Sequence, residues 1–249
     1  MSSYDPPRIF DDAQAPPRVS SPLSAQVQVN KFIANVFSWM VLGLLITGAT
    51  AYYFATSGAI EMMFNLETGS MNLLGWVITL SPLAFILVMN FGLNRLSKEA
   101  LWLLFLAFSA VMGMSLSYIF LIYTQGSIAS VFLITSLTFA VMAVVGYTTQ
   151  TDLTRFGSLL MMALVGLIIA SVVNIFMEST MMEFVISAVG VLIFTGLIAY
   201  DTQKLKRIGS GVEYGSAEAS KLAILGATSL YLDFINLFLH LLRLLGRRE

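Results

Sequence analysis

Seven long apolar runs constrain this chain more than any other feature. They lie at 32–54, 72–91, 101–123, 128–147, 156–177, 184–201 and 222–242. A helix needs roughly 20 mostly apolar residues to cross the hydrocarbon core of a bilayer, and each run is about that long. The first run is longer than the apolar core of a cleaved signal peptide and follows a polar stretch, so we expect it to remain as a span. The sequence therefore predicts an all-α, polytopic membrane protein with seven transmembrane helices.

The composition supports the same class and excludes several others. Hydrophobic residues make up 57% of the 249 residues and charged residues only 11%, whereas soluble domains carry about 25% charged residues. A net charge of −1 gives no basis for binding nucleic acid. The chain has no cysteine and a single histidine, His240, so we expect no disulfide, no cofactor and no tight metal site. The expected surroundings are the lipid bilayer.

Proline marks a change in organisation near residue 30. Residues 1–30 are predicted to form a disordered N-terminal tail, and residues 31–249 a transmembrane domain. The sixth proline, Pro82, lies inside the second span and should kink it, with the freed carbonyl satisfied by a neighbouring helix. The five prolines of the tail are Pro6, Pro7, Pro16, Pro17 and Pro22.

Basic residues predict the orientation of the chain. With the N-terminus in the cytoplasm, ten of the 13 Lys and Arg residues fall on the cytoplasmic side, and the outer loops between spans contain only acidic charges. The exceptions are Arg243, Arg247 and Arg248 near the C-terminus. They lie outside if the last run crosses the membrane and inside if it enters and returns, and the charge bias leaves both possibilities open.

Two helical faces carry small or polar residues. Ser109, Gly113 and Ser117 in the third span form a small-xxx-small face, which predicts close helix packing. A weaker face in the fifth span holds Ser171, Asn174 and Glu178, but one such face among seven spans is expected by chance.

Polar residues form a longer stripe in the last span. Their spacing of 4, 3, 4 and 3 residues keeps them on one side of a helix, and such a stripe is expected to line the bundle interior or a wet path rather than face lipid. The stripe consists of Ser229, Asp233, Asn236, His240 and Arg243.

Two carboxylates fall within the spans, Asp201 in the sixth and Asp233 in the seventh, and buried carboxylates are functional candidates. Asp201 can instead be an interfacial residue that pairs with Lys204 or Lys206, and Asp233 can make a merely structural hydrogen bond between helices. The two aspartates meet only if the sixth span is displaced inward or the start of the seventh protrudes into the cytosol. Two carboxylates in such a site cannot both ionise cheaply and titrate as a pair. That arrangement suits a pH switch, a proton relay or a cation site.

Two stretches carry a resemblance to a known family. SLYLDFINLFLHLLRLLG at 229–246 and GLIAYDTQKLKRI at 196–208 resemble the Bax inhibitor-1 (transmembrane Bax-inhibitor-motif) family, its bacterial branch above all. The resemblance implies a seven-helix bundle around a central C-terminal helix that crosses the membrane fully. It also implies that Asp201 and Asp233 form a hydrogen-bonded dyad toward the cytoplasmic side, associated with pH-sensitive calcium leak.

The resemblance extends to a latch and to partners. In the family a basic residue at the inner end of the second span is linked to the dyad in the closed form. Arg95 is the matching candidate here and Lys98 the second. The family is also associated with cytoprotection in eukaryotes, and a bacterial branch with restraint of a membrane-bound protease.

We compare three functions that these features suggest, two of them non-enzymatic. The leading one is a pH-sensitive Ca²⁺ leak pathway in a bacterial inner membrane, with the N-terminus cytoplasmic, H⁺ as the controlling ion and only weak Ca²⁺ binding at the dyad. The second is a membrane protein that regulates a protease or a stress response by contact.

The third is an intramembrane aspartyl protease, which would also place aspartates in these two spans. Its second aspartate should follow Gly-x-Gly, but Leu230, Tyr231 and Leu232 precede Asp233 here. No Pro-Ala-Leu motif is present, the nearest match being Ser-Pro-Leu at 81–83. We therefore expect that the protein is not an enzyme.

Overall fold

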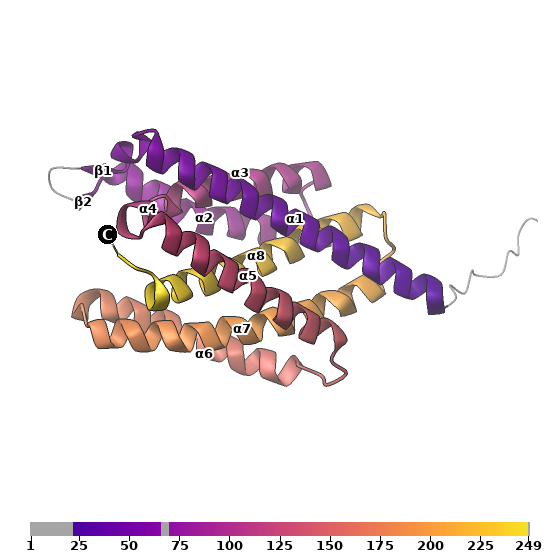
Figure 1. Cartoon of the computed structure of the whole chain (residues 1–249). Coiled ribbons are helices and arrows are strands. Elements are labelled where there is room, and N and C mark those ends of the chain that lie inside the picture. Colours follow the sequence, from indigo (N-terminus) through magenta and orange to yellow (C-terminus); the bar gives the residue numbers. More distant parts are fainter. Residues whose placement is uncertain (1–21, 66–69, 249) are drawn as a thin grey trace, which may run out of the picture.

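The chain folds into a bundle of long helices (Figure 1), shown by a computed structural model that describes residues 22–65 and 70–248. Seven helices of the described chain are long and apolar enough to cross a membrane, as predicted. They are α1 (Pro22–Thr56), α2 (Leu73–Gly92), α3 (Lys98–Leu116) continued by the short α4 (Ile119–Ile122), α5 (Gln125–Thr148), α6 (Thr154–Met177), α7 (Thr180–Gly211) and α8 (Ala217–Leu245).

Polar caps explain where most of these helices begin. The first backbone N–H groups of a helix lack partners within the helix, and a polar side chain before the first turn accepts from one of them. Five helices of the described chain start in this way, after Asn72, Ser97, Thr124, Ser179 and Ser216.

Short elements close one end of the bundle. A 3-10 helix, η1 (Ala59–Met62), leads into an antiparallel pair of two-residue strands, β1 (Phe64–Asn65) and β2 (Ser70–Met71). The C-terminus lies at this same end, which we call the hairpin end, whereas α1 begins at the opposite end beside the α7–α8 connection (Figure 1). We call that opposite end the basic end, because Lys204, Lys206 and Lys221 lie near it. The helix α8 therefore runs through the whole bundle.

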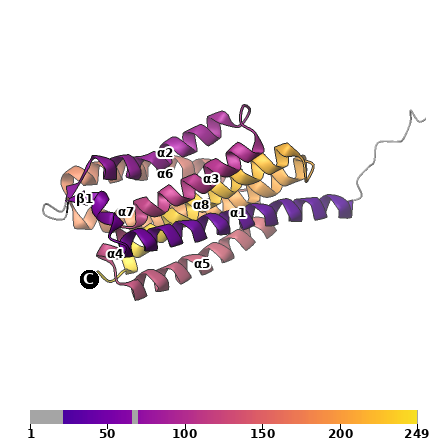
Figure 2. The ribbon, with the colours of Figure 1, turned by 90° about the horizontal axis from the view of Figure 1, so that it is seen from above.

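The C-terminal helix is central, as the family resemblance implied. It contacts α1, α3, α5 and α7, and Figure 2 shows it running between α3 and α1. Tyr231, at its middle, is fully buried. The peripheral helix α6 is the opposite case, since most of its apolar side chains are exposed. Helix α8 thus forms the core on which α1, α3, α5 and α7 pack, while α2 packs on α3 and α6 on α7.

The small-residue face of α3 packs as predicted. Ser109 and Ser117 are fully buried. A Cβ on Gly113 would lie only 2.5 Å from the backbone oxygen of Thr47 on α1. The Thr47 hydroxyl donates to the Ser109 carbonyl oxygen at 2.8 Å and lies 2.6 Å from the Tyr231 hydroxyl. This close approach joins α1, α3 and α8.

The structure corrects the predicted boundary of the N-terminal tail. Residues 22–30, assigned to the tail, form the first turns of α1, and Val29 is buried there. Pro22 is the first helical residue, a position that proline suits because its missing N–H has no partner in a first turn. Residues 1–21 lie outside the described part of the chain.

The carbonyl freed by Pro82 finds a different partner from the one predicted. Proline lacks the N–H that would bond to the carbonyl oxygen of Ile78. The hydroxyl of Ser81 donates to that oxygen at 2.9 Å, so the group is satisfied within α2 rather than by a neighbouring helix. The small polar side chain next to the proline makes this local solution available.

Candidate functional site

Asp201 lies at the interface of α7 and α8, well inside its helix rather than at its end. Helix α7 continues ten residues beyond it to Gly211. The carboxyl is 9% exposed and accepts a hydrogen bond of 2.5 Å from the hydroxyl of Ser229 on α8. The predicted span ended at Asp201 because apolarity stops there, but residues 203–207, QKLKR, are good helix formers and continue the helix.

Tight contacts fix the register of the two antiparallel helices. The pairs are Leu205 on Gly226, Asp201 on Ser229, and His240 on Gly190. Because the helices are antiparallel, moving a given number of residues forward along α8 corresponds to moving the same number of residues back along α7. By this register Asp233 stands level with Leu197, one helical turn or about 6 Å along the helix axis from Asp201.

Asp233 is buried, but its carboxyl makes no hydrogen bond with any residue that the structure describes. Its Oδ2 atom is fully enclosed, and the carboxyl interacts electrostatically with Asp201 and with Lys204. The hydrogen bond between the two aspartates that the resemblance implied is not formed. The register explains this difference, because it places Ser229 rather than Asp233 opposite Asp201.

The basic ends of α7 and α8 enclose a crevice that reaches the site. Its volume is about 270 Å³, and Asp201 and Lys204 both line it. Helix α2 supplies Ile86 and Asn90 on the opposite side. Asp201 is thus accessible from the basic end, whereas Asp233 lies deeper, behind Ser229.

The predicted latch residues lie away from the two carboxyls. Arg95 is exposed in the turn after α2, and its side chain forms no bond or ion pair with the described residues. Lys98 lies 3.7 Å from Glu99 at the surface. Lys204, one of the two partners predicted for Asp201, interacts electrostatically with both aspartates but forms no ion pair with either. The other, Lys206, donates instead to the backbone oxygen of Tyr147 at 2.8 Å.

The polar stripe on α8 lies in the interior of the bundle over most of its length, but its last residue does not. Asn236 is half-buried and donates to the backbone oxygen of Leu232 at 2.8 Å. His240 is buried, with its ring stacked on Phe194 at 5.6 Å between centroids. Arg243, at the hairpin end, is exposed. The interior part of the stripe therefore runs from Ser229 to His240.

A second cavity lies beyond His240 at the hairpin end. Its volume is about 330 Å³, and Tyr118, Tyr123, Glu183 and Arg243 contribute polar groups to it. The C-terminal segment closes one side, since Arg248 lies 3.5 Å from Glu183. Backbone bonds hold this segment in place, with Thr124 N–H donating to the Arg247 carbonyl oxygen and Arg247 N–H to the Ser127 hydroxyl.

Three polar side-chain atoms are buried without a partner among the described residues, and all belong to α7 or α8. They are Ser187 Oγ, Asp233 Oδ2 and His240 Nδ1. Ser187 lies one turn from Gly190, the residue against which His240 packs. Buried polar groups normally have partners, so this seam is exceptional. Sequence reasoning missed Ser187 because a lone serine in an apolar helix gives no signal.

The other polar face predicted in the fifth span has a local role. Asn174 accepts from the backbone N–H of Ser179 at 3.2 Å and so closes the end of α6. Ser171 donates to the backbone oxygen of Leu167 at 2.8 Å. Glu178 adopts a left-handed conformation at the end of the helix, with φ of 50°. These residues shape a turn and do not form a site.

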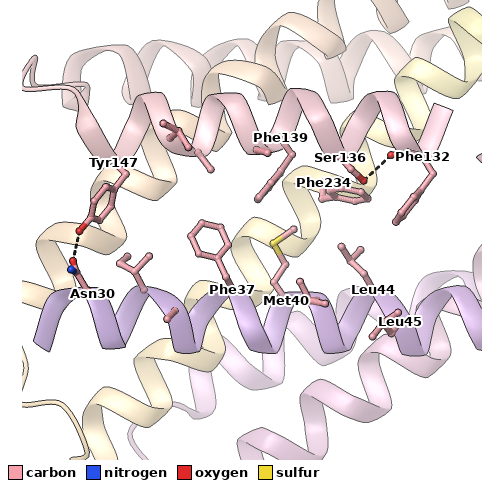
Figure 3. Close-up of a pocket in the computed structure, with 16 residues that line it drawn as sticks. Asn30, Phe37, Met40, Leu44, Leu45, Phe132, Ser136, Phe139, Tyr147 and Phe234 are labelled. Carbon is pink, nitrogen blue, oxygen red and sulfur yellow. Dashed lines mark hydrogen bonds between the residues drawn. The ribbon is translucent and has the colours of Figure 1, made fainter. Parts of the chain in front are cut away.

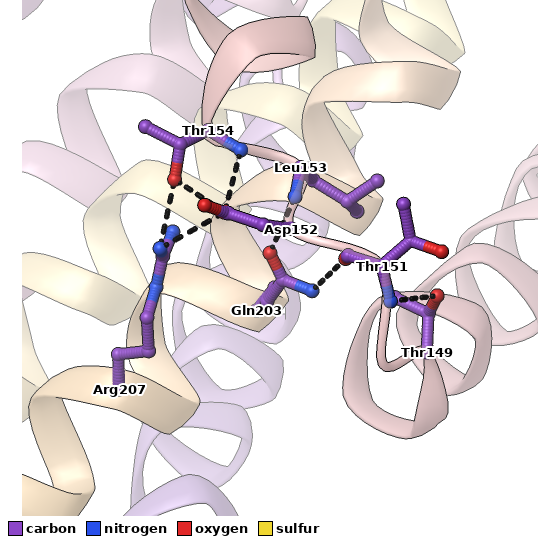
Figure 4. Close-up of polar contacts among 7 residues, drawn as sticks. All are labelled: Thr149, Thr151, Asp152, Leu153, Thr154, Gln203 and Arg207. Carbon is purple, nitrogen blue, oxygen red and sulfur yellow. Dashed lines mark hydrogen bonds and ion pairs between the residues drawn. The ribbon is translucent and has the colours of Figure 1, made fainter.

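The residues after Asp201 hold the α5–α6 connection (Figure 4). The buried amide of Gln203 donates to the Thr151 oxygen and accepts from the Leu153 N–H, both at 2.8 Å. Asp152 lies 3.2 Å from Arg207 and accepts from Thr154. The Thr154 hydroxyl, then its backbone N–H, lowers the pKa of the exposed Asp152 carboxyl, and Arg207 adds to this effect. This network positions the part of α7 that carries Asp201.

Comparison with known proteins gives one consistent result. Residues 29–249 match the family described as "Inhibitor of apoptosis-promoting Bax1". The inner membrane protein YbhL of Escherichia coli K12 is 42% identical over 235 residues, which is 94% of this chain and 98% of that protein. A Borreliella burgdorferi protein is 45% identical over 220 residues, 88% of this chain and 93% of its own length. A Rickettsia prowazekii protein, RP147, is 42% identical over 226 residues, 89% and 91% of the two chains.

Proposed function

The chain belongs to the Bax inhibitor-1 family, and on this premise we propose that it is a pH-sensitive leak pathway for Ca²⁺ across a bacterial inner membrane. Asp201 and Asp233 are its proton-sensitive groups in this proposal, and neither acts as a catalyst. The observation that carries the proposal is the burial of both carboxyls on adjoining helices, with one cation, Lys204, interacting with both. Ionisable groups at such depth are kept for function more often than for stability.

Polar groups mark a course through the bundle. It begins at the crevice beside Asp201, passes Asp233 and Asn236, and reaches His240 next to the cavity at the hairpin end. From Ser229 to Arg243 the helix rises about 21 Å, which is most of the roughly 30 Å hydrocarbon core. The atoms of Ser187, Asp233 and His240 that lack a partner among the described residues lie along the same seam, and separation of α7 and α8 would expose them to a hydrated ion.

Ca²⁺ is the cargo in this proposal and not a resident ion. The described residues contain no group of three or more His, Cys, Asp or Glu side chains that could hold a metal. An ion that must leave again needs binding that is favourable but weak. Two carboxylates in sequence, assisted by hydroxyl and amide oxygens, fit that requirement.

Protonation supplies the control. At lower pH the pair retains a proton, and the remaining charge is balanced by Lys204. As pH rises the proton is lost, and the repulsion between two carboxylates in a medium of low dielectric constant favours separation of α7 and α8. We therefore expect Ca²⁺ flux to increase with pH. In this proposal Lys204 takes the role that the resemblance gave to a residue at the end of α2.

The test is Ca²⁺ flux into liposomes that contain the purified protein, measured from acidic to mildly alkaline pH. Asp201→Asn and Asp233→Asn should each remove the pH dependence, and Lys204→Gln should shift it. Glu61→Gln, which changes an exposed carboxyl outside the spans, is the matched control and should behave as wild type. A pH profile that is the same in wild type and in both span variants contradicts the proposal.

A second candidate is a membrane protein that regulates a membrane-bound protease or a stress response by contact. The description of the matched family as an inhibitor favours it, as does the outward-facing apolar surface of α6. Co-purification of a protease whose activity changes on binding, together with no flux from the purified protein, supports this candidate over the leak pathway. Flux without any such partner supports the first.

A further inference from the structure

A long apolar groove runs between α1 and α5 (Figure 3). Both helices pack on α7 and α8, and the space left between them has a volume of about 860 Å³. Phe234 of α8 contributes to its floor. Val41, Leu45 and Val144 on its rims are 52%, 65% and 61% exposed, so the groove opens toward the surroundings of the bundle. In a membrane-spanning region those surroundings are lipid.

One end of the groove is polar. Asn30 and Tyr147 meet there through a hydrogen bond from the Tyr147 hydroxyl to the Asn30 side-chain oxygen (Figure 3). The side-chain amide of Gln26 donates to both of these residues at 3.0 Å. These groups lie at the basic end of the bundle. Tyrosine and amide side chains at such a level are typical of the interface between hydrocarbon and headgroups.

A polar cavity of about 470 Å³ adjoins this end. Lys206 and Arg207 line it together with Gln26 and Gln150. The Lys206 ammonium also lies 4.8 Å from the centre of the Tyr147 ring, so a single residue connects the cavity to the groove. The apolar groove therefore ends at hydrogen-bond donors and positive charge.

We propose that the groove and this cavity together bind one anionic phospholipid, with an acyl chain along α1 and α5 and the phosphate beside Lys206. From Asn30 to Leu45 the groove follows α1 for about 22 Å, longer than one leaflet of a roughly 30 Å hydrocarbon core. The shape therefore accommodates a chain, and the polar end lies where the headgroup of that chain would lie.

The charges at the polar end select an anion. An ammonium has three N–H donors, and among the described residues only the backbone oxygen of Tyr147 accepts from Lys206. The carboxyl in the cavity, Asp152, is already engaged by Arg207 and Thr154. Because Arg207 and Asp152 balance each other, the charge left in the cavity is the positive charge of Lys206, which suits a phosphate with a net negative charge.

The groove is too narrow for a helix of another protein. Phe37 of α1 and Phe139 of α5 contact each other across it, with ring centroids 6.2 Å apart. A helix with its side chains is about 10–12 Å wide and cannot pass between these helices without separating them. An acyl chain can lie along the rings. The site also shares no lining residue with the proposed leak pathway.

The test is native mass spectrometry of the full chain after exchange with vesicles of equal parts phosphatidylglycerol and phosphatidylcholine. We expect one retained phosphatidylglycerol per chain. Lys206→Gln should lower the preference for phosphatidylglycerol about fivefold, the effect of one basic residue at a membrane surface. Ala140→Trp, which fills the groove from the exposed side of α5, should lower retention of both lipids.

Matched controls are Arg155→Gln, another basic residue at the same end, and Ala129→Trp, an exposed alanine of α5 outside the groove; both should retain lipid as wild type does. If Ala140→Trp does not fold, Ala34→Phe on α1 fills the groove from the other side. Equal retention of the two lipids, unchanged by Lys206→Gln, overturns the proposal. Equal loss of lipid in the groove variants and in their controls also overturns it, as does a peptide segment bound in the groove in place of lipid.

Discussion

Gly190 and His240 offer a sharp test of how α7 and α8 pack. A Cβ on Gly190 would lie 2.6 Å from three atoms of the His240 ring, whereas ordinary contact begins at 3.4 Å. The ring is buried and stacked on Phe194, so it has little room to move. We expect Gly190→Ala to be destabilising, because the close approach of the two helices depends on the missing side chain.

The magnitude follows from two opposed effects. Overpacking a well-packed interior costs about 1–3 kcal/mol, while replacing glycine by alanine inside a helix contributes about 0.8–1.0 kcal/mol of stability. Gly190→Ala should therefore lower the free energy of unfolding by up to about 2 kcal/mol in the wild-type chain. In a His240→Ala background the clash is absent, and the same substitution should stabilise by up to about 1 kcal/mol. The coupling between the two positions is then the overpacking cost itself, about 1–3 kcal/mol.

The assay is reversible unfolding in mixed detergent micelles, followed by circular dichroism, for the four proteins of the double-mutant cycle. Gly166→Ala is the matched control, because no atom lies within 4 Å of its added Cβ and it should stabilise in both backgrounds. An effect of Gly190→Ala that matches that of Gly166→Ala in the wild-type chain, or that is the same with and without His240, refutes the register described for α7 and α8.

Three further predictions concern other contacts. Gly113→Ala should destabilise by about 1–3 kcal/mol, because its Cβ would lie 2.5 Å from the backbone oxygen of Thr47; detergent unfolding measures it, and a stabilised variant contradicts it. Tyr231→Phe should lower stability by about 1 kcal/mol in the same assay, since it removes the 2.6 Å hydrogen bond with the Thr47 hydroxyl; no change means that this bond contributes nothing. Asp152 has a lowered pKa because Thr154 donates to its carboxylate, so its contribution to stability is present above the ordinary value of 3.8 and is lost as pH falls through its folded-state pKa. Asp152→Asn should therefore weaken the acid dependence of unfolding, and an unchanged pH profile contradicts that reasoning.

The seven spans were predictable because a bilayer imposes a length and an apolar composition on each one. Helix ends were less predictable where the chain leaves the hydrocarbon. The last ten residues of α7 and the first turns of α1 are helical and polar, and apolarity alone gives no sign of them. N-caps such as Ser216 mark starts more directly, since a side-chain oxygen before the helix is a local signal.

The pairing of Asp201 and Asp233 depends on information that neither helix carries alone. A polar stripe fixes which face of α8 turns inward, but the offset along α7 is set by where small residues allow close approach, at Gly190 and Gly226. That offset places Ser229 beside Asp201 and moves Asp233 one turn deeper. A shift of one turn between the two helices would bring the carboxyls level, and the contact of His240 with Gly190 opposes that shift. The same packing that keeps the aspartates apart in this conformation therefore connects the hairpin end of the bundle to the charge at its centre. In the proposed leak pathway, a substitution at Gly190 should for that reason change Ca²⁺ flux as well as stability.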